Sequence, residues 1–329
     1  MAGDRISRHL SSPAASNHYG VEALSLEGPG IRVVCVPSLG AKLVSIVNLD
    51  SGREWLVQPR VLLGPVPYAG AFTEGDMSGW DEMFPTINPC PYPLPGGRAG
   101  SKLPDHGEVW SLPWSVAEST GTSLTLSIEG RALPYRLTRR LMLAGRAALR
   151  MRYRLENLSD EPLTWLWAAH PQFACPPGTA VILADEVVDL LQVCEPDSGW
   201  VPAGAPVTWP WATTPGGSRV RIDRIAAGVG RGFYKLYVRP EQQLNWAAMS
   251  DETTGDRLRL SWDPGQIPYL GIWVDQACFN DVPTIALEPS TGFYDDLAHA
   301  HGNGRAVTTA PRQAVQWQLA VTLAAGDTG

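Results

Sequence analysis

Short stretches of alternating apolar and polar residues recur along almost the whole chain. They are rich in β-branched residues and end at Gly, Pro, Asn or Ser, which is typical of strands separated by turns. Stretches with the period of an amphipathic helix are nearly absent. Strands this numerous predict an all-β protein, built as a large antiparallel β-sandwich. The expected strands are Val21–Leu26, Ile31–Val36, Ala41–Val47, Leu124–Glu129, Leu137–Leu143, Leu149–Glu156, Leu163–Ala169, Gly232–Val238, Leu258–Trp262, Ile267–Val274, Thr284–Glu288 and Ala314–Leu323.

Two long segments interrupt this pattern. Residues 58–104 are rich in proline, and residues 194–217 are rich in Pro, Gly and Trp. Long loops in a compact domain usually form lids or the walls of binding sites. No shift in composition and no repeat of fixed period divides the chain. We therefore expect a flexible N-terminal segment, residues 1–19, followed by a single domain, residues 20–325.

Charge and composition exclude several classes of protein. The 329 residues carry a formal net charge of -7, from 26 Lys plus Arg and 33 Asp plus Glu. Nucleic-acid binding needs a concentrated positive face, so no nucleic-acid partner is expected. No apolar run approaches the ~18 residues that span a bilayer, so no membrane segment is expected.

Cysteine usage and the N-terminus bear on the cellular compartment. The five cysteines lie far apart without a CxxC pair, which predicts neither a disulfide framework nor a zinc site. Residues 1–20 lack the apolar run of a secretory signal. Both features favour the cytoplasm. Only three of the basic residues are Lys, and Ala and Pro are abundant, which suggests a bacterial source with a GC-rich genome.

Two histidines stand in contexts that suit catalysis. His106 follows the proline-rich segment, and Gly107 would let a ligand approach its imidazole closely. His170 ends an apolar run before Pro171, where a strand is expected to stop, which places it at the rim of a sheet. The alternative interpretations are an exposed loop histidine for His106 and a buried structural histidine for His170.

Glu288 is the third candidate, because it ends a strand without other charges. A buried carboxylate requires a partner, so a fold would not place it in the interior without a role. The alternative is a solvent-facing Glu on an edge strand. His299 and His301 have metal-ligand spacing, but they lie in an expected loop without a third ligand, so no metal is expected. The motifs GxSxG, GxxxxGK and strand-linked GxGxxG are missing, which argues against acyl-enzyme and nucleotide chemistry.

These contexts together resemble the aldose 1-epimerase (galactose mutarotase) family. The matching segments follow the family's order and extend over about residues 20–325. Each is short, and their order and strand context carry the resemblance. They are Gly40–Ile46, Gly52–Leu56, His106–Trp110, His170–Phe173 and Glu288–Gly292. The resemblance implies a galactose mutarotase-like supersandwich and an isomerase that interconverts the α and β anomers of a cyclic aldose without a cofactor.

The resemblance also implies roles for individual residues. Glu288 would be the general base on the C1 hydroxyl, and His170 the general acid at the ring oxygen. His106 would orient the sugar and stabilise charge near that oxygen. Indole rings and carboxylates are typical of sugar pockets, so we expect a pocket wall made from Trp80, Asp81, Glu82 and Trp110. The expected partner is a small sugar, and the expected assembly is a monomer or a homodimer.

The sequence departs from the family pattern at positions that bear on the substrate. Gln172 replaces the usual aromatic residue after the second histidine, residues 268–273 lack the glutamine of galactose-type members, and no arginine matches the one ahead of the first histidine. The expected sugar-contacting Asp is either Asp185 or Asp189. Two alternatives therefore stay open. One is an enzyme for a modified or anionic cyclic sugar, and the other is a non-catalytic carbohydrate-binding protein. An anionic sugar could be bound by Arg98, Arg131 or Arg231.

Overall fold

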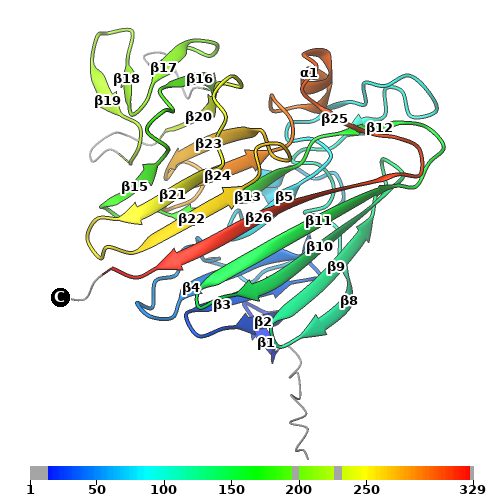
Figure 1. Ribbon diagram of the computed structural model, residues 1–329, viewed down its shortest axis with the longest axis horizontal. Coiled ribbons are helices and arrows are strands. Elements are labelled where there is room, and N and C mark those ends of the chain that lie inside the picture. Colours follow the sequence, from blue (N-terminus) through cyan, green and yellow to red (C-terminus); the bar gives the residue numbers. More distant parts are fainter. Residues whose placement is uncertain (1–13, 195–199, 226–231, 327–329) are drawn as a thin grey trace, which may run out of the picture.

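The computed structural model describes residues 14–194, 200–225 and 232–326, and most of them form antiparallel strands (Figure 1). The larger sheet has 14 strands, one of which, β14 (Phe173–Ala174), pairs with β24 outside the main order. The other strands follow one another in the order β1 (Ala14–His18), β2 (Val21–Glu27), β3 (Ile31–Val36), β4 (Lys42–Asn48), β5 (Trp80–Met83), β13 (Ala168–Pro171), β24 (Pro283–Ser290), β23 (Tyr269–Gln276), β20 (Phe233–Val238), β16 (Asp189–Cys194), β17 (Pro206–Thr208), β18 (Trp211–Thr213) and β19 (Arg219–Arg221).

The second sheet has eight strands and packs against the larger one through a shared apolar core. Its order is β15 (Thr179–Ile182), β21 (Trp246–Asp251), β22 (Arg257–Trp262), β26 (Ala314–Ala324), β11 (Ala148–Asn157), β10 (Tyr135–Ala144), β9 (Ser123–Glu129) and β8 (Ser115–Thr120). The remaining elements are short. They are the pairs β12 (Leu163–Trp165) with β25 (Val307–Thr309) and β6 (Cys90–Pro91) with β7 (Lys102–Leu103), the 3-10 helix η1 (Phe72–Glu74) and the α-helix α1 (Leu297–Gly302).

The core lies between the two sheets, because each sheet turns one apolar face inward. Strand β10 shows the alternation clearly, with Leu137 and Leu141 fully buried. Polar contacts join the layers, since Arg139 of β10 and Tyr153 of β11 both donate to Glu82 of β5, at 2.7 and 2.9 Å. They tie β5, in the middle of the larger sheet, to the second sheet.

The predicted all-β antiparallel sandwich is confirmed, and three local expectations need correction. The stretch Leu163–Ala169 is divided between β12 and β13. Strand β13 continues through Pro171 and pairs with β5 along its whole length. It pairs with β24 only at Ala168, so no ladder hydrogen bond on that side requires an N–H from residue 171. His170 therefore lies inside the sheet and not at its rim. His299 and His301 lie on α1 and not in a loop, because Asp296 caps that helix by accepting from the His299 N–H.

The ends of the chain and the long segments also contain ordered elements. Of the predicted flexible segment 1–19, residues 14–18 form β1, and residues 1–13 lie outside the described residues. The proline-rich segment 58–104 contributes β5, and the segment 194–217 contributes β17 and β18. Among the described residues, no helix has the length and apolar character needed to cross a membrane.

Candidate active site

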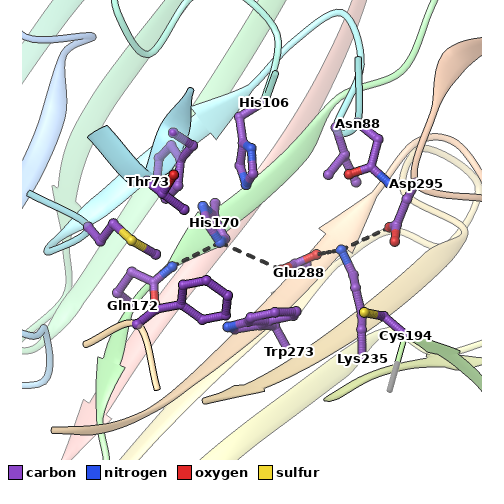
Figure 2. A pocket seen from close by; sticks show the side chains of 14 residues that line it. Thr73, Asn88, His106, His170, Gln172, Cys194, Lys235, Trp273, Glu288 and Asp295 are labelled. Carbon is purple, nitrogen blue, oxygen red and sulfur yellow. Dashed lines mark hydrogen bonds and ion pairs between the residues drawn. The ribbon is translucent and has the colours of Figure 1, made fainter. Parts of the chain in front are cut away.

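A cavity of about 250 Å³ opens beside the middle strands of the larger sheet. Its floor consists of side chains from β13, β20, β23 and β24, and loops after η1 and β5 complete the wall (Figure 2). Polar and aromatic groups alternate around it, as in small-molecule sites. Its lining includes Phe72, Thr73, Asn88, His106, His170, Gln172, Lys235, Trp273, Phe279, Glu288 and Asp295.

Glu288 of β24 is 2% exposed and forms an ion pair across the cavity floor. Its Oε2 lies 2.6 Å from Nζ of Lys235 on β20, and the same Nζ lies 2.8 Å from Oδ1 of Asp295. The Tyr237 hydroxyl donates to that Asp295 oxygen at 2.8 Å. Figure 2 shows the contacts from Glu288 through Lys235 to Asp295 as one line. Glu288 is therefore neither solvent-facing nor on an edge strand.

The charges of this cluster oppose the effect of burial. Burial raises the pKa of Glu288 above its usual value, and the ammonium group of Lys235 offsets part of this rise. Burial would lower the pKa of Lys235, but the carboxylates of Asp295 and Glu288 outweigh it and raise that pKa. Lys235 is thus held as a cation, and its charge favours the ionised form of Glu288.

His170 of β13 is buried at 4% exposure and faces Glu288. Its Nε2 lies 3.8 Å from the Glu288 Oε1 and 2.9 Å from Nε2 of Gln172. Burial lowers the pKa of His170 well below its usual value, and the positive charges of His106, Lys235 and Lys42 lower it further. The ring is therefore neutral at neutral pH, and it accepts a hydrogen bond from the Gln172 amide.

His106 lies at a tight turn above His170, with φ 57°. The next residue must be Gly107, because a Cβ there would lie 2.0 Å from the Phe84 carbonyl oxygen. The His106 Nδ1 donates to Oδ1 of Asp105 at 2.8 Å, and the other Asp105 oxygen accepts from the Phe72 N–H at 2.8 Å. The Phe72 ring stacks on the imidazole at 4.2 Å. His106 is thus a fixed group with a carboxylate behind it.

The charge of Asp105 is secured by this arrangement. Burial would raise the pKa of Asp105, but the hydrogen bond and the charge of His106 outweigh it, so that this pKa is lowered. The ring centroids of His106 and His170 lie 5.1 Å apart, so the imidazole held by Asp105 and the buried imidazole border the cavity together.

The expected wall residues do not line this cavity, so that expectation is corrected. Trp80, Asp81 and Glu82 are 0% exposed, because β5 lies between β4 and β13 and both its faces are covered. Glu82 accepts from Arg139 at 2.7 Å, and Asp81 forms an ion pair with Lys42 at 3.1 Å. Trp110 is 5% exposed and packs with its edge against Phe72, behind the wall.

The other predicted contacts also lie elsewhere. Asp185 and Asp189 are exposed, and neither lines the cavity. Arg98 is exposed on another face, Arg131 covers the ring of Tyr68, and Arg231 lies outside the described residues. In the part of the chain that the structure describes, no three His, Cys, Asp or Glu side chains form a metal-binding group.

Sequence reasoning missed Lys235, Asp295 and Asp105. A signal was present for Lys235, which is one of only three lysines in the chain and the only charge in the strand Phe233–Val238. Such a residue needs a buried partner. Asp295 and Asp105 stand in loops with ordinary composition, and nothing local distinguished them.

Comparisons with known proteins agree with the geometry. The family model described as aldose 1-epimerase matches residues 22–213. The Slr1438 protein from Synechocystis sp. PCC 6803 is 17% identical with a TM-score of 0.67, covering 98% of this chain and 99% of its own. A galactose mutarotase related enzyme from Lactobacillus acidophilus is 15% identical with a TM-score of 0.63, covering 93% and 98%. A galactose mutarotase-like protein from Clostridium acetobutylicum is 13% identical with a TM-score of 0.64, covering 95% and 98%.

No curated protein matches the chain in sequence. The solved structures, at these identities, show the shared fold alone. The family match carries more, because it extends over more than half of the chain and includes the segments around His106 and His170. The chain therefore belongs to the aldose 1-epimerase family.

Proposed function

We propose that this protein is an aldose 1-epimerase, which interconverts the α and β anomers of a cyclic aldose by opening and closing the ring. One observation carries the proposal. A buried carboxylate, Glu288, has one oxygen bound to Lys235, and its other oxygen faces the imidazole of His170, beside which the His106 ring lies. A base and an acid that face one another across a cavity are what hemiacetal opening requires.

The reaction can be written with the groups in place. The Glu288 Oε1 accepts the proton of the C1 hydroxyl, the C1–O5 bond breaks, and its electron pair goes to O5. An imidazolium donates a proton to O5, which leaves an open-chain aldehyde. Rotation about C1–C2 and the reverse steps on the other face of the carbonyl give the second anomer and return both protons.

We assign the proton donor to His106, which departs from the role that the resemblance implies for His170. A donor must be held in a fixed orientation, and the Asp105 carboxylate accepts from Nδ1 of His106 at 2.8 Å behind the ring. Burial keeps His170 neutral. His170 then orients the sugar through a hydrogen bond.

The wall suits an uncharged ring with hydroxyl groups. Trp273 and Phe279 present aromatic faces that can cover the C–H face of a sugar. Thr73, Asn88 and Gln172 offer hydroxyl and amide groups for sugar hydroxyls. This division of labour between apolar area and a few polar contacts is general in ligand pockets.

The test is the rate at which freshly dissolved α-glucose, α-galactose and several deoxy and anionic sugars approach anomeric equilibrium, followed by NMR exchange. We expect Glu288→Gln to lower turnover by about two to four orders of magnitude, the usual size of an acid–base contribution. Asp81→Asn is the matched control, because Asp81 is an equally buried carboxylate outside the cavity.

Three results would contradict the proposal or redirect it. Near-wild-type turnover in Glu288→Gln removes that residue from the mechanism. Acceleration of anionic sugars alone would favour the enzyme for a modified hemiacetal. Sugar binding without any acceleration would identify a carbohydrate-binding protein of the same fold.

A further inference from the structure

We propose that Lys235, held in place by Asp295, is a positioning residue for Glu288. It engages one carboxylate oxygen, keeps the other turned toward His170 and the substrate, and maintains the carboxylate in its ionised form. This inference rests on the proposed function, because it assigns Glu288 the role of base. The geometry and the charges of the cluster both support it.

The sheet is built to allow this contact. Lys235 and Glu288 lie on β20 and β24, which are separated by β23. The register places Gly271 of β23 opposite Glu288 on one side and opposite Tyr237 on the other. A Cβ at Gly271 would lie 3.2 Å from the Glu288 Oε2 and 3.4 Å from Cε of Lys235. The absence of a side chain at Gly271 therefore leaves the space through which Lys235 reaches across a strand.

The far side of the lysine is fixed as well. Asp295 accepts from both Lys235 and the Tyr237 hydroxyl, each at 2.8 Å. A long ammonium side chain held by two carboxylates has little rotational freedom left, so the orientation of Glu288 is fixed with it. The opposite oxygen, Oε1, remains directed at His170.

Among the charges around Glu288, Lys235 favours its ionised form most strongly, and His106 does so more weakly. The titratable groups that face it are Lys235 on β20, Asp295 after β24, His170 on β13, Tyr237 on β20, and His106 from its loop. Asp295 disfavours a negative charge on Glu288, and His170 is neutral. Among the described residues that line the cavity, Lys235 is the only Lys or Arg.

A different role for this lysine, covalent capture of the open-chain aldehyde, does not fit its surroundings. Imine formation requires a neutral amine. The two carboxylates hold Lys235 in its charged form, since they raise its pKa. Lys235 therefore acts through its charge on Glu288.

The experiment is the pH profile of kcat/KM for anomer exchange in wild type and three variants. A base must be ionised, so the rate falls as pH drops through the pKa of Glu288. We expect Lys235→Gln to shift this acid limb upward by at least about one pH unit, since a neighbouring cation lowers a carboxyl pKa by about 1–3 units. Lys235→Arg should restore the limb to near its wild-type position.

Asp295→Asn provides a second test in the opposite direction. It removes a negative charge beside Glu288, so the acid limb should move to lower pH. This variant removes a buried charge and adds none, which keeps the inference testable even where Lys235→Gln does not fold. Lys42→Gln is the matched control, because it removes an equally buried lysine with two carboxylate partners outside the cavity. The acid limb of the Lys42→Gln profile should stay at its wild-type pH.

The outcomes separate this inference from the proposed function. Lower activity with an unmoved acid limb in both Lys235→Gln and Asp295→Asn would overturn the positioning role. A wild type without anomer exchange would overturn the proposed function instead. In that case the Glu288 carboxyl is titrated directly by 13C NMR in the same variants, and its pKa must still move upward in Lys235→Gln and downward in Asp295→Asn.

Discussion

Two clusters beside the larger sheet each contain one buried lysine and two carboxylates, in different surroundings. In one, Lys235 lies between Glu288 and Asp295, at 2.6 and 2.8 Å. In the other, Lys42 lies between Asp76 and Asp81, at 2.8 and 3.1 Å. Each lysine is 5% exposed. Both clusters thus satisfy one buried ammonium with two carboxylates, as a buried charge requires.

The two clusters differ in whether they line the cavity beside the histidines. Lys42 donates further to the Ser78 carbonyl at 3.0 Å, and β5 with its neighbours covers Asp81 completely. The Lys235 cluster borders the cavity, with one Glu288 oxygen facing His170. Under the proposed function, a similar arrangement of charges stabilises the fold in one place and holds a base in the other.

His170 lies between the two clusters, so it offers the strongest way to test the comparison. It is the register partner of Asp81 across β13 and β5, and both lysines lower its pKa. We expect His106→Asn to lower turnover by about two to four orders of magnitude, as the loss of an acid does. His170→Asn, which removes a neutral hydrogen-bonding ring, should cost at least about tenfold less. Anomer exchange by NMR measures both.

The pH profile provides an independent check on the same assignment. A proton donor must be protonated, so the rate falls as pH rises through its pKa. If His170 were the donor, the rate would already decline well below pH 6.5, because its pKa is lowered well below that value. A wild-type basic limb in that acidic range, or a larger loss in His170→Asn than in His106→Asn, would return the role to His170.

Removing the lysine of the Lys42 cluster should destabilise the fold. Lys42→Met leaves the buried Asp81 and the partly buried Asp76 without their cation, so the free energy of unfolding should fall by about 3–5 kcal/mol. Denaturant unfolding measures it. Lys102→Met is the control, since Lys102 is exposed and its loss should change stability by no more than about 0.5 kcal/mol. A loss below about 1 kcal/mol in Lys42→Met would show that this cluster does not support the fold.

The sequence predicted the sandwich because strand alternation is a local signal. Leu137–Leu143 and Leu149–Glu156 lie within β10 and β11. His106, His170 and Glu288 could be singled out because turn residues or uncharged neighbours surround them, and the structure brings all three to one cavity. Local context was enough for residues of this kind.

The wall and the ion pairs could not be predicted in the same way. The segment around Trp80 reads as loop, and its burial depends on pairing with β4 and β13, which are distant in sequence. The contact between Lys235 and Glu288 depends on the register of three strands and on the missing side chain at Gly271. Such long-range geometry leaves little trace in either segment alone.

The cluster of Lys42, Asp76 and Asp81 should also make stability depend on pH. Burial raises the pKa of Asp81 to about 6, even though Lys42 lowers it. In the unfolded chain the same group titrates near its usual ~3.9. Between these values the folded state binds a proton that the unfolded state lacks. The contribution of Asp81 to stability therefore declines as pH rises from about 4 to about 6 and stays low above that range.

Asp81→Asn removes this titration, so the variant should gain stability relative to wild type as pH rises. A shift of about two pKa units corresponds to about 3 kcal/mol, which is the expected growth of the difference in unfolding free energy between pH 4 and pH 8. Denaturant unfolding of both proteins at the two pH values measures it, and the difference cancels the titration of all other groups. A difference that stays constant with pH would mean that the pKa of Asp81 is the same in the folded and the unfolded protein, which would contradict the prediction.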